Sequence, residues 1–228
     1  MSRMEDDCVD YSITSPPYNI GYNNMHGKDV RKYKKYNDKM RPEDYSEWLY
    51  RCLDEMIRLS KLHVFFNIQM LGGNKVNVLE IMGDYSDKIK DIIIWNKNVA
   101  PPHIEPGIMN SKFEFIIILS SDKPHQKKFR DGNFRGNFNN VIEGSNASRN
   151  PYAKVHKATF PEYLPRLMMN KFGKEGDIWF DPFMGTGTTA VAATIEKRRW
   201  VGSEIYNEYY DIAIERIEEV ERQGNLFA

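Results

Sequence analysis

The sequence predicts a doubly wound α/β fold with a mostly parallel sheet, and three features of the chain predict it. Short apolar segments of strand length alternate with segments in which apolar residues recur every three or four positions. The short segments are apolar at almost every position, which is typical of strands buried on both faces. A glycine-rich turn around Gly185 joins one such strand directly to a helix. This alternation predicts a single domain over residues 1–228.

In the first half of the chain, the apolar segments predict four strands, at 9–14, 63–68, 91–96 and 113–120. After the first strand, Pro42 opens a helix at the first-turn position that proline favours. Apolar residues follow at helical spacing from Tyr45 to Ile57, and a weaker helix is expected around 73–83. The segment 19–42 is polar, basic and rich in tyrosine and asparagine, so we expect it to be a mobile loop.

The segment 121–155 interrupts the alternation with glycine, asparagine, basic residues and isolated phenylalanines. We interpret it as an excursion from the core and not as a second domain. The alternation then resumes with helices at 161–172, 187–197 and 207–222 and strands at 177–180 and 200–205. The prediction is therefore a core of six strands.

The charge of the chain is balanced in sum but uneven in distribution. The 228 residues carry a net charge of zero, with 41% apolar and 28% charged residues, which suits one globular domain with a sizeable core. Seven basic residues lie within 28–41, and eight basic residues face three acidic ones within 122–157. The last predicted helix is acidic. A neutral protein can thus present a basic face to a nucleic acid.

The remaining composition excludes several classes. Cys8 and Cys52 have no metal-ligand spacing and are too few for a disulfide framework, so we expect no metal site. No apolar run reaches membrane-spanning length, and the acidic N-terminus does not resemble a signal peptide. We expect a cytoplasmic protein.

The glycine-rich turn is the first candidate site. Gly185 and Gly187 allow a tight turn and a close approach to a ligand, at the start of a helix whose free N–H groups face that ligand. Glu204 ends the next strand 23 residues after Asp181, where an acid can accept hydrogen bonds from ribose hydroxyls. A turn that only connects strand to helix is the alternative, but this combination favours a nucleotide-like cofactor. The candidate residues are Asp181, Pro182, Phe183, Gly185, Gly187, Thr188 and Glu204.

The second candidate site follows the first predicted strand, at Ser15, Pro16, Pro17 and Tyr18. Two prolines fix the backbone and remove two N–H donors, which leaves carbonyl acceptors, a hydroxyl and an aromatic face. This set suits a planar group that presents an NH2: Ser15 Oγ and the Pro16 carbonyl accept its protons, and Tyr18 stacks on its ring. The residues alone leave open a purely structural turn with Tyr18 in the core.

Taken together, these motifs resemble the amino-group DNA methyltransferases of the β arrangement, from about Val9 to Arg216. The segment 14–18 resembles the family's catalytic motif, and 181–189 resembles its S-adenosylmethionine motif. Thr159, Phe160 and Pro161 belong to a segment similar to the family's HxAxFP motif, which lines the methionine side of the cofactor pocket. The resemblance implies a Rossmann-like fold, S-adenosylmethionine as cofactor, double-stranded DNA as partner, and methylation of a base that is flipped out of the helix.

One expectation departs from the family. The family has a further strand, ahead of the catalytic one, that contacts the cofactor's adenine, and this chain begins too late to include it. We therefore expect six core strands instead of seven, with 200–205 as an exposed edge and with the adenine less well held.

The sequence leaves two alternatives for the target base. In the family, Ser at the first catalytic position favours cytosine N4 and Asp or Asn favours adenine N6, so Ser15 favours cytosine N4. A catalytically impaired nucleic-acid-binding protein is the alternative from another class, and an RNA or protein-glutamine substrate is a weaker one.

Two segments are candidates for DNA contact. The basic loop offers Lys32, Lys34 and Lys35 for phosphates, and 122–150 is the best candidate for reading the sequence. The candidate readout residues with positive charge are Lys127, Lys128, Arg130 and Arg135.

The chain ends with an apolar pair, Leu226 and Phe227, beyond the last predicted helix, which we expect to stop near Gly224. We favour the ordinary interpretation, in which this pair folds back on the core. The alternative is that 223–227 resembles the short peptide by which many DNA enzymes bind the replication sliding clamp, which requires an exposed tail. The sequence leaves open whether the chain forms a homodimer.

Overall fold

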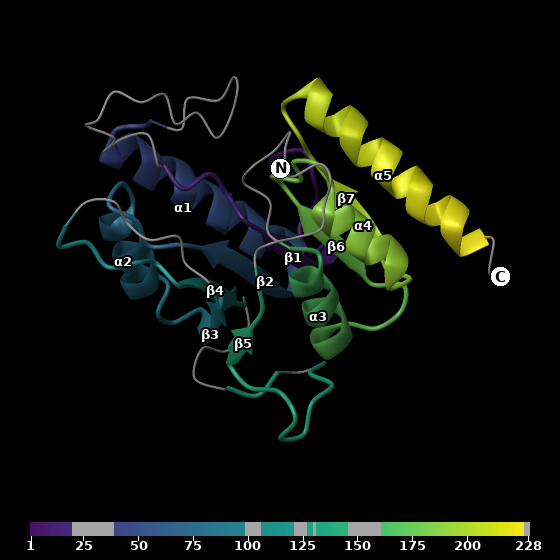
Figure 1. Ribbon diagram of the computed structural model, residues 1–228, viewed down its shortest axis with the longest axis horizontal. Helices are drawn as coiled ribbons and strands as arrows, with labels where there is room; N and C mark the ends of the chain where they lie inside the picture. Colours follow the sequence, from purple (N-terminus) through teal and green to yellow (C-terminus); the bar gives the residue numbers. More distant parts are fainter. Residues whose placement is uncertain (20–38, 99–105, 121–126, 130, 146–160, 226–228) are drawn as a thin grey trace.

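The computed structural model describes residues 1–19, 39–98, 106–120, 127–129, 131–145 and 161–225. A seven-stranded sheet with the order β5-β3-β4-β2-β1-β6-β7 forms the centre of the domain (Figure 1). Its strands are β1 Val9–Thr14, β2 Ser60–Ile68, β3 Ile89–Asn96, β4 Phe113–Leu119, β5 Val141–Glu143, β6 Ile178–Asp181 and β7 Arg199–Gly202. Its helices are α1 Pro42–Leu59, α2 Lys75–Asp84, α3 Tyr163–Phe172, α4 Thr188–Ile195 and α5 Asn207–Asn225. The predicted mostly parallel α/β architecture is confirmed.

Strand direction brings distant parts of the sequence to one edge of the sheet. β1 pairs in parallel with β2 and β6, and β6 pairs in parallel with β7. Within the described sheet, β4 runs against its neighbours β2 and β3, so its first residues lie beside their last ones. The carboxyl ends of β1, β2, β3 and β6 therefore share an edge with the start of β4. In open α/β sheets this is the edge where ligands bind.

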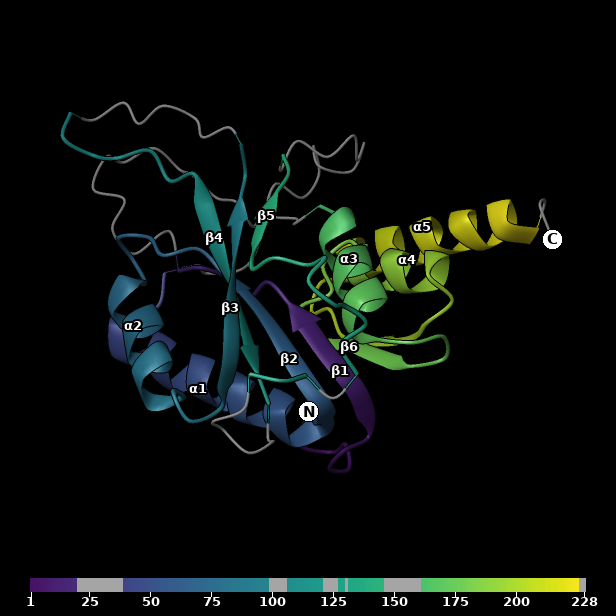
Figure 2. The same ribbon diagram turned by 90° about the horizontal axis from the view of Figure 1, so that it is seen from below.

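Helices cover both faces of the sheet (Figure 2). α1 packs on one face, where its fully buried Leu49 and Leu53 join Val64 and Phe66 of β2 in one core cluster. α3 and α4 pack on the other face, and α5 packs against α4. The α1 sequence explains its placement: proline starts the helix, acids occupy its first turn, and one stripe of residues is apolar.

Six strands were predicted and all six are present, but the sheet has a seventh strand that the prediction missed. This is β5, three residues that pair in parallel with the end of β3. Only Ile142 of β5 is buried, and one buried residue gives no periodic signal. β7 forms the other edge of the described sheet, as expected, and its residues alternate between exposed and partly exposed. α5 ends at Asn225, next to the Gly224 near which the sequence predicts its end.

Part of the segment 121–155 is anchored to the core. Phe129, Phe134 and Phe138 surround Phe172 at the end of α3, with ring centroids 5.0, 5.3 and 5.8 Å away. Phe129 also meets His63 of β2 edge-on at 5.2 Å. The phenylalanines that look isolated in the sequence are thus the contacts that hold this segment against the sheet. Among the helices of the described ranges, none has the length and apolar character to cross a membrane.

Candidate active site

The turn after β1 lies at the carboxyl edge of the sheet and is fixed from several sides. Thr14 and Pro16 are buried, while Ser15, Pro17 and Tyr18 are partly exposed. The Pro17 carbonyl accepts a hydrogen bond from the Tyr45 hydroxyl of α1 at 2.8 Å. A proline-fixed backbone with its carbonyl held by a neighbouring helix has little freedom to rearrange when a substrate binds.

Beside this turn, a polar cluster joins three strand ends. Tyr18 Oη lies 2.8 Å from Ser15 Oγ and donates to Glu114 Oε2 at 2.9 Å. Asn67, near the end of β2, donates to the same Glu114 oxygen at 3.2 Å. Lys97, just after β3, forms an ion pair with the other oxygen of Glu114 at 3.2 Å. Glu114, Lys97 and Asn67 are 8%, 6% and 3% exposed, so this is a buried network next to a partly exposed Ser15.

Asp181 connects the two sequence motifs. Its carboxylate accepts hydrogen bonds from Thr14 Oγ1 at 2.7 Å, from Thr189 Oγ1 at 2.6 Å and from the Phe183 N–H at 3.0 Å. Burial raises the pKa of Asp181 to about 6, against the effect of these three hydrogen bonds. Because Thr14 directly precedes Ser15, the carboxylate fixes the candidate catalytic turn (14–18) relative to the glycine-rich turn.

The glycine-rich turn has the shape that the sequence predicts. Gly185 and Gly187 both have positive φ, at 53° and 80°. A Cβ on Gly187 would lie 2.8 Å from the Ala213 side chain of α5, so this position needs glycine for space as well as for conformation. The Glu204 carboxylate accepts from the Gly185 N–H and from the Tyr206 N–H, both at 2.9 Å. Glu204 therefore stands at the turn itself.

Two further contacts hold this turn, and the sequence did not indicate either. The buried Arg216 of α5 donates to the Thr186 carbonyl. On the other side, the Phe183 ring lies 5.3 Å from Trp48, which stacks on Tyr45 at 5.7 Å. Since Tyr45 also binds the Pro17 carbonyl, α1 bridges the two turns. Helical periodicity marked Tyr45 and Trp48 only as core residues, and no sequence pattern links Arg216 to a turn 30 residues earlier.

The residues at the turn fit S-adenosylmethionine. Thr188 Oγ1, at the first position of α4, is buried and has no hydrogen-bond partner in the described parts of the chain. Its hydroxyl thus keeps its capacity for a ligand. Next to it, Gly185 and Gly187 let the backbone approach closely, and Glu204 supplies a charged acceptor. A cofactor with a ribose diol and a charged amino-acid end matches such a set of groups.

Only some of the other predicted site residues lie in the described part of the chain. Pro161 is buried just before α3, whereas Thr159, Phe160, Lys32, Lys34, Lys35 and Arg130 lie outside the described residues. Lys127, Lys128 and Arg135 are exposed on the segment that Phe129 and Phe134 anchor. Phe129 contacts His63, four residues before Asn67 on β2, which is roughly 13 Å at about 3.3 Å per residue. The Phe129 anchor of this segment therefore lies toward the opposite end of β2 from Asn67.

The need for glycine at position 187 can be tested against a matched position. We expect Gly187→Ala to lose S-adenosylmethionine binding and to lower the free energy of unfolding by more than Gly176→Ala does. Both glycines have a similar positive φ, 80° at Gly187 and 84° at Gly176, but of the two only Gly187 has a neighbour within 4 Å of an added Cβ. Urea unfolding and calorimetric titration with the cofactor measure both effects. Equal losses of stability and of cofactor affinity in the two variants would show that backbone strain alone causes them.

Comparison with known proteins agrees with this geometry. Residues 9–215 match the DNA methylase family of N6 and N4 methyltransferases. Among curated relatives, the type II methyltransferase M.Cfr9I of Citrobacter freundii is 33% identical over 57% of this chain and 44% of its own length. The orphan methyltransferase M.BamHII of Bacillus amyloliquefaciens is 27% identical over 92% of this chain and 89% of its own.

Solved structures share the fold at low sequence identity. The cytosine-N4-specific PvuII DNA methyltransferase superposes with a TM-score of 0.69 at 16% identity, over 97% of this chain and 86% of that one. A DNA modification methylase of Thermus thermophilus, in complex with S-adenosyl-L-methionine, has a TM-score of 0.65 at 22% identity, over 96% and 89%. With the family match covering most of the sequence, the chain belongs to the DNA methylase family and is an S-adenosylmethionine-dependent DNA methyltransferase of the cytosine-N4 or adenine-N6 type.

Proposed function

We propose that this enzyme methylates N4 of a cytosine that is flipped out of double-stranded DNA. The observation that carries the proposal is the contact between the two turns: Thr14, the neighbour of Ser15, binds Asp181 of the cofactor motif at 2.7 Å. A methyl donor at the glycine-rich turn and an amine at Ser15 are then neighbours. Ser at this position and the cytosine-N4 specificity of the similarly folded PvuII enzyme favour cytosine over adenine.

The protein's own groups act mainly by positioning the target amine. Ser15 Oγ and the Pro16 carbonyl accept the two amine protons, which draws the nitrogen lone pair out of conjugation with the ring, and Tyr18 stacks on the base. When bound, S-adenosylmethionine supplies an electrophilic methyl group. The candidates for holding it are Asp181, Pro182, Phe183, Gly185, Gly187, Thr188 and Glu204, and the family resemblance adds Thr159, Phe160 and Pro161. Direct transfer needs no covalent intermediate on the enzyme.

The methylated base that is formed shows whether the target is cytosine or adenine. DNA treated with the enzyme and S-adenosylmethionine should yield N4-methylcytosine on hydrolysis and mass spectrometry. Ser15→Ala should lose most of this product, whereas Ser86→Ala, the same change at an exposed turn, should not. N6-methyladenine as the product would establish the adenine alternative. Saturable cofactor binding without any methylated base would instead favour the catalytically impaired binding protein.

The role of Glu204 can be tested by affinity for the cofactor. We expect Glu204→Ala to weaken S-adenosylmethionine binding about tenfold or more, because charged hydrogen bonds contribute about 1.5–3 kcal/mol. Glu218→Ala, an exposed carboxylate on α5, is the matched control for calorimetry. Glu204→Gln keeps an acceptor for the Gly185 N–H and so separates loss of the turn from loss of a ribose contact. Equal affinity in wild type and both Glu204 variants would refute the ribose assignment.

We also propose that the basic segment 28–41 supplies the main phosphate contacts. Its support is the stem of the segment: the Asn19 side chain accepts from the Met40 N–H at 2.7 Å and donates to the Met40 carbonyl at 3.0 Å. Asn19 and Met40, which flank the residues between them that include most of this segment, therefore meet directly beside Tyr18. A readout role for Lys127, Lys128, Arg130 and Arg135 requires DNA that extends to the opposite part of the sheet, where the phenylalanine anchors lie.

Salt dependence compares the two segments. Replacing Lys32, Lys34 and Lys35 together by alanine should weaken binding to all sequences. It should also flatten the plot of log affinity against log salt by about 0.9 for each phosphate that the variant no longer neutralises. The Lys127→Ala/Lys128→Ala double variant should change that slope much less. The reverse result would place the phosphate contacts on the anchored segment.

The sliding-clamp hypothesis remains a proposal for the end of the chain. Its required glutamine, Gln223, is exposed on α5 and bonded to Glu219 at 3.3 Å. Leu226 and Phe227 lie outside the described residues. A clamp peptide would therefore start from the last turn of a helix.

A further inference from the structure

Three groups in the described part of the chain lie within hydrogen-bond distance of the Tyr18 hydroxyl, and two of them can only accept. Glu114 Oε2, at 2.9 Å, belongs to a carboxylate, and a carboxylate can only accept. The Asn67 carbonyl, at 3.4 Å, can only accept as well. The third neighbour, Ser15 Oγ at 2.8 Å, can donate or accept. Since a phenol has one proton, and a charged acceptor forms the stronger bond, the Tyr18 proton points to Glu114.

This direction determines what Ser15 can do. With the Tyr18 proton committed to Glu114, the 2.8 Å contact requires Ser15 to donate to Tyr18 Oη. The only proton of the Ser15 hydroxyl then points away from the substrate, and the lone pairs of its Oγ remain for incoming N–H groups. An amine that is bound through its N–H groups needs such an acceptor. If Tyr18 donated to Ser15 instead, Ser15 could turn its own proton toward the amine, which is the wrong polarity.

Donors from β2 and from the residue after β3 face the two oxygens of the Glu114 carboxylate. Lys97 pairs with Glu114 Oε1 at 3.2 Å, and Asn67 donates to Oε2 at 3.2 Å and to the Phe115 carbonyl at 3.1 Å. A buried carboxylate is costly unless it is paired and hydrogen-bonded, and here both oxygens have donors. The network lies where β2, β3 and β4 meet, so the antiparallel direction of β4 is what brings Glu114 to the catalytic turn.

We infer that Glu114 is a positioning residue that makes Ser15 an acceptor for the target amine and that receives the proton which the amine loses, through Tyr18 and Ser15. The inference rests on the proposed role of Ser15 as the amine contact. It adds a residue that no sequence motif indicated and provides an acceptor for the amine proton.

Protons and electrons balance in the methyl transfer. The amine lone pair forms the new N–C bond, while the S–C bond of the sulfonium breaks and leaves its electron pair on sulfur. The methylated nitrogen, now positive, gives one proton to Ser15 Oγ. Ser15 passes its own proton to Tyr18 Oη, and Tyr18 passes its own to the Glu114 carboxylate. A neutral methylamine and a neutral carboxylic acid result, and the acid later returns its proton to water.

Single-turnover methylation of DNA tests the chain of hydrogen bonds. We expect Glu114→Gln and Tyr18→Phe each to lower the rate of methyl transfer at least tenfold, because one removes the proton acceptor and the other the link to it. KM for DNA and the Kd for S-adenosylmethionine should stay near their wild-type values, since the Tyr18 ring and the cofactor turn are retained. The Tyr18→Phe/Glu114→Gln double variant should be no slower than the slower single variant, because both act in one chain.

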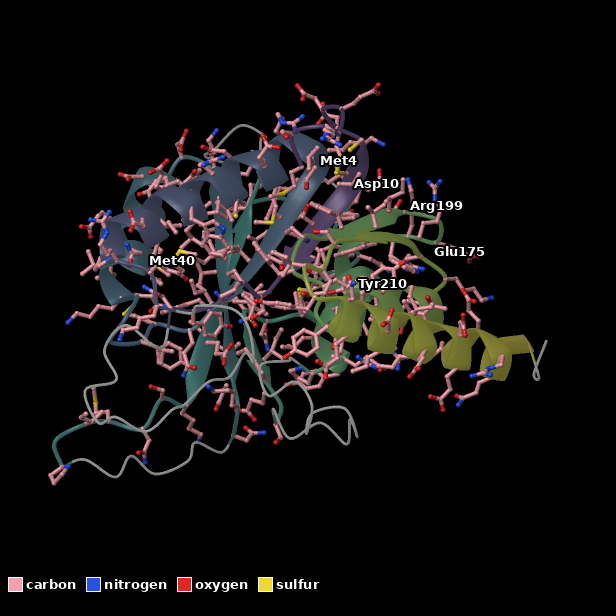
Figure 3. The ribbon with its side chains drawn as sticks, turned by 90° about the horizontal axis from the view of Figure 1, so that it is seen from above. Met4, Asp10, Met40, Glu175, Arg199 and Tyr210 are labelled. Atoms are coloured by element: carbon pink, nitrogen blue, oxygen red, sulfur yellow. The ribbon has the colours of Figure 1, made fainter. Side chains whose placement is uncertain are left out.

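Two further variants test whether a slower reaction has another cause, such as a destabilised fold. Glu114→Gln leaves the Lys97 ammonium buried without its partner and can destabilise the fold, so Lys97→Met/Glu114→Gln, which removes both charges, repeats the test. Glu175→Gln is the matched control, an exposed carboxylate that Figure 3 shows on the side of the molecule away from Met40. It should react at the wild-type rate.

The outcomes separate this inference from the function on which it rests. Wild-type rates in Glu114→Gln or in the charge-free pair variant would overturn it, and so would a double variant whose loss equals the product of the two single losses. A raised KM for DNA with an unchanged transfer rate would give Glu114 a merely structural role and overturn it too. If the wild-type enzyme methylates no base amine at all, the proposed function itself fails.

Discussion

The buried carboxylate of Asp181 is the interaction on which the arrangement of this enzyme depends. It ends β6 and accepts hydrogen bonds from Thr14 on β1 and from Thr189 on α4. An ionised carboxylate in a dry interior is stable only with such donors, so the two hydroxyls and the acid hold one another in place. Because the candidate catalytic turn continues from Thr14 and the glycine-rich turn from Asp181, this group links the two turns directly.

A second layer of contacts makes that distance rigid. On the α1 side, Tyr45 binds the catalytic turn and Trp48 meets Phe183. On the α5 side, Arg216 holds the Thr186 carbonyl. Transfer of a methyl group between two bound molecules gains most of its rate from alignment, and small errors of position are costly. Contacts from α1 and α5 thus hold the two turns in place.

The accuracy of the sequence-based prediction followed the length and regularity of each signal. The six predicted strands are all present, with ends within three residues of the predicted ones, and Pro42 and the glycine-rich turn marked their elements correctly. β5 was missed because it is three residues long and has one buried side chain. The phenylalanines of 121–155 looked isolated because their common partner, Phe172, lies more than 30 residues further along the chain.

The sequence by itself determined the alternation of strands and helices, the glycine-dependent turn and the chemistry of the tetrapeptide at Ser15. Each of these depends on local backbone geometry or on periodicity, which neighbouring residues specify. Only the tertiary structure decided that Glu114 and Lys97 stand behind Tyr18. That juxtaposition depends on β4 running antiparallel between β2 and β3. Strand order and direction are properties of the whole sheet, so no short stretch of sequence carries them.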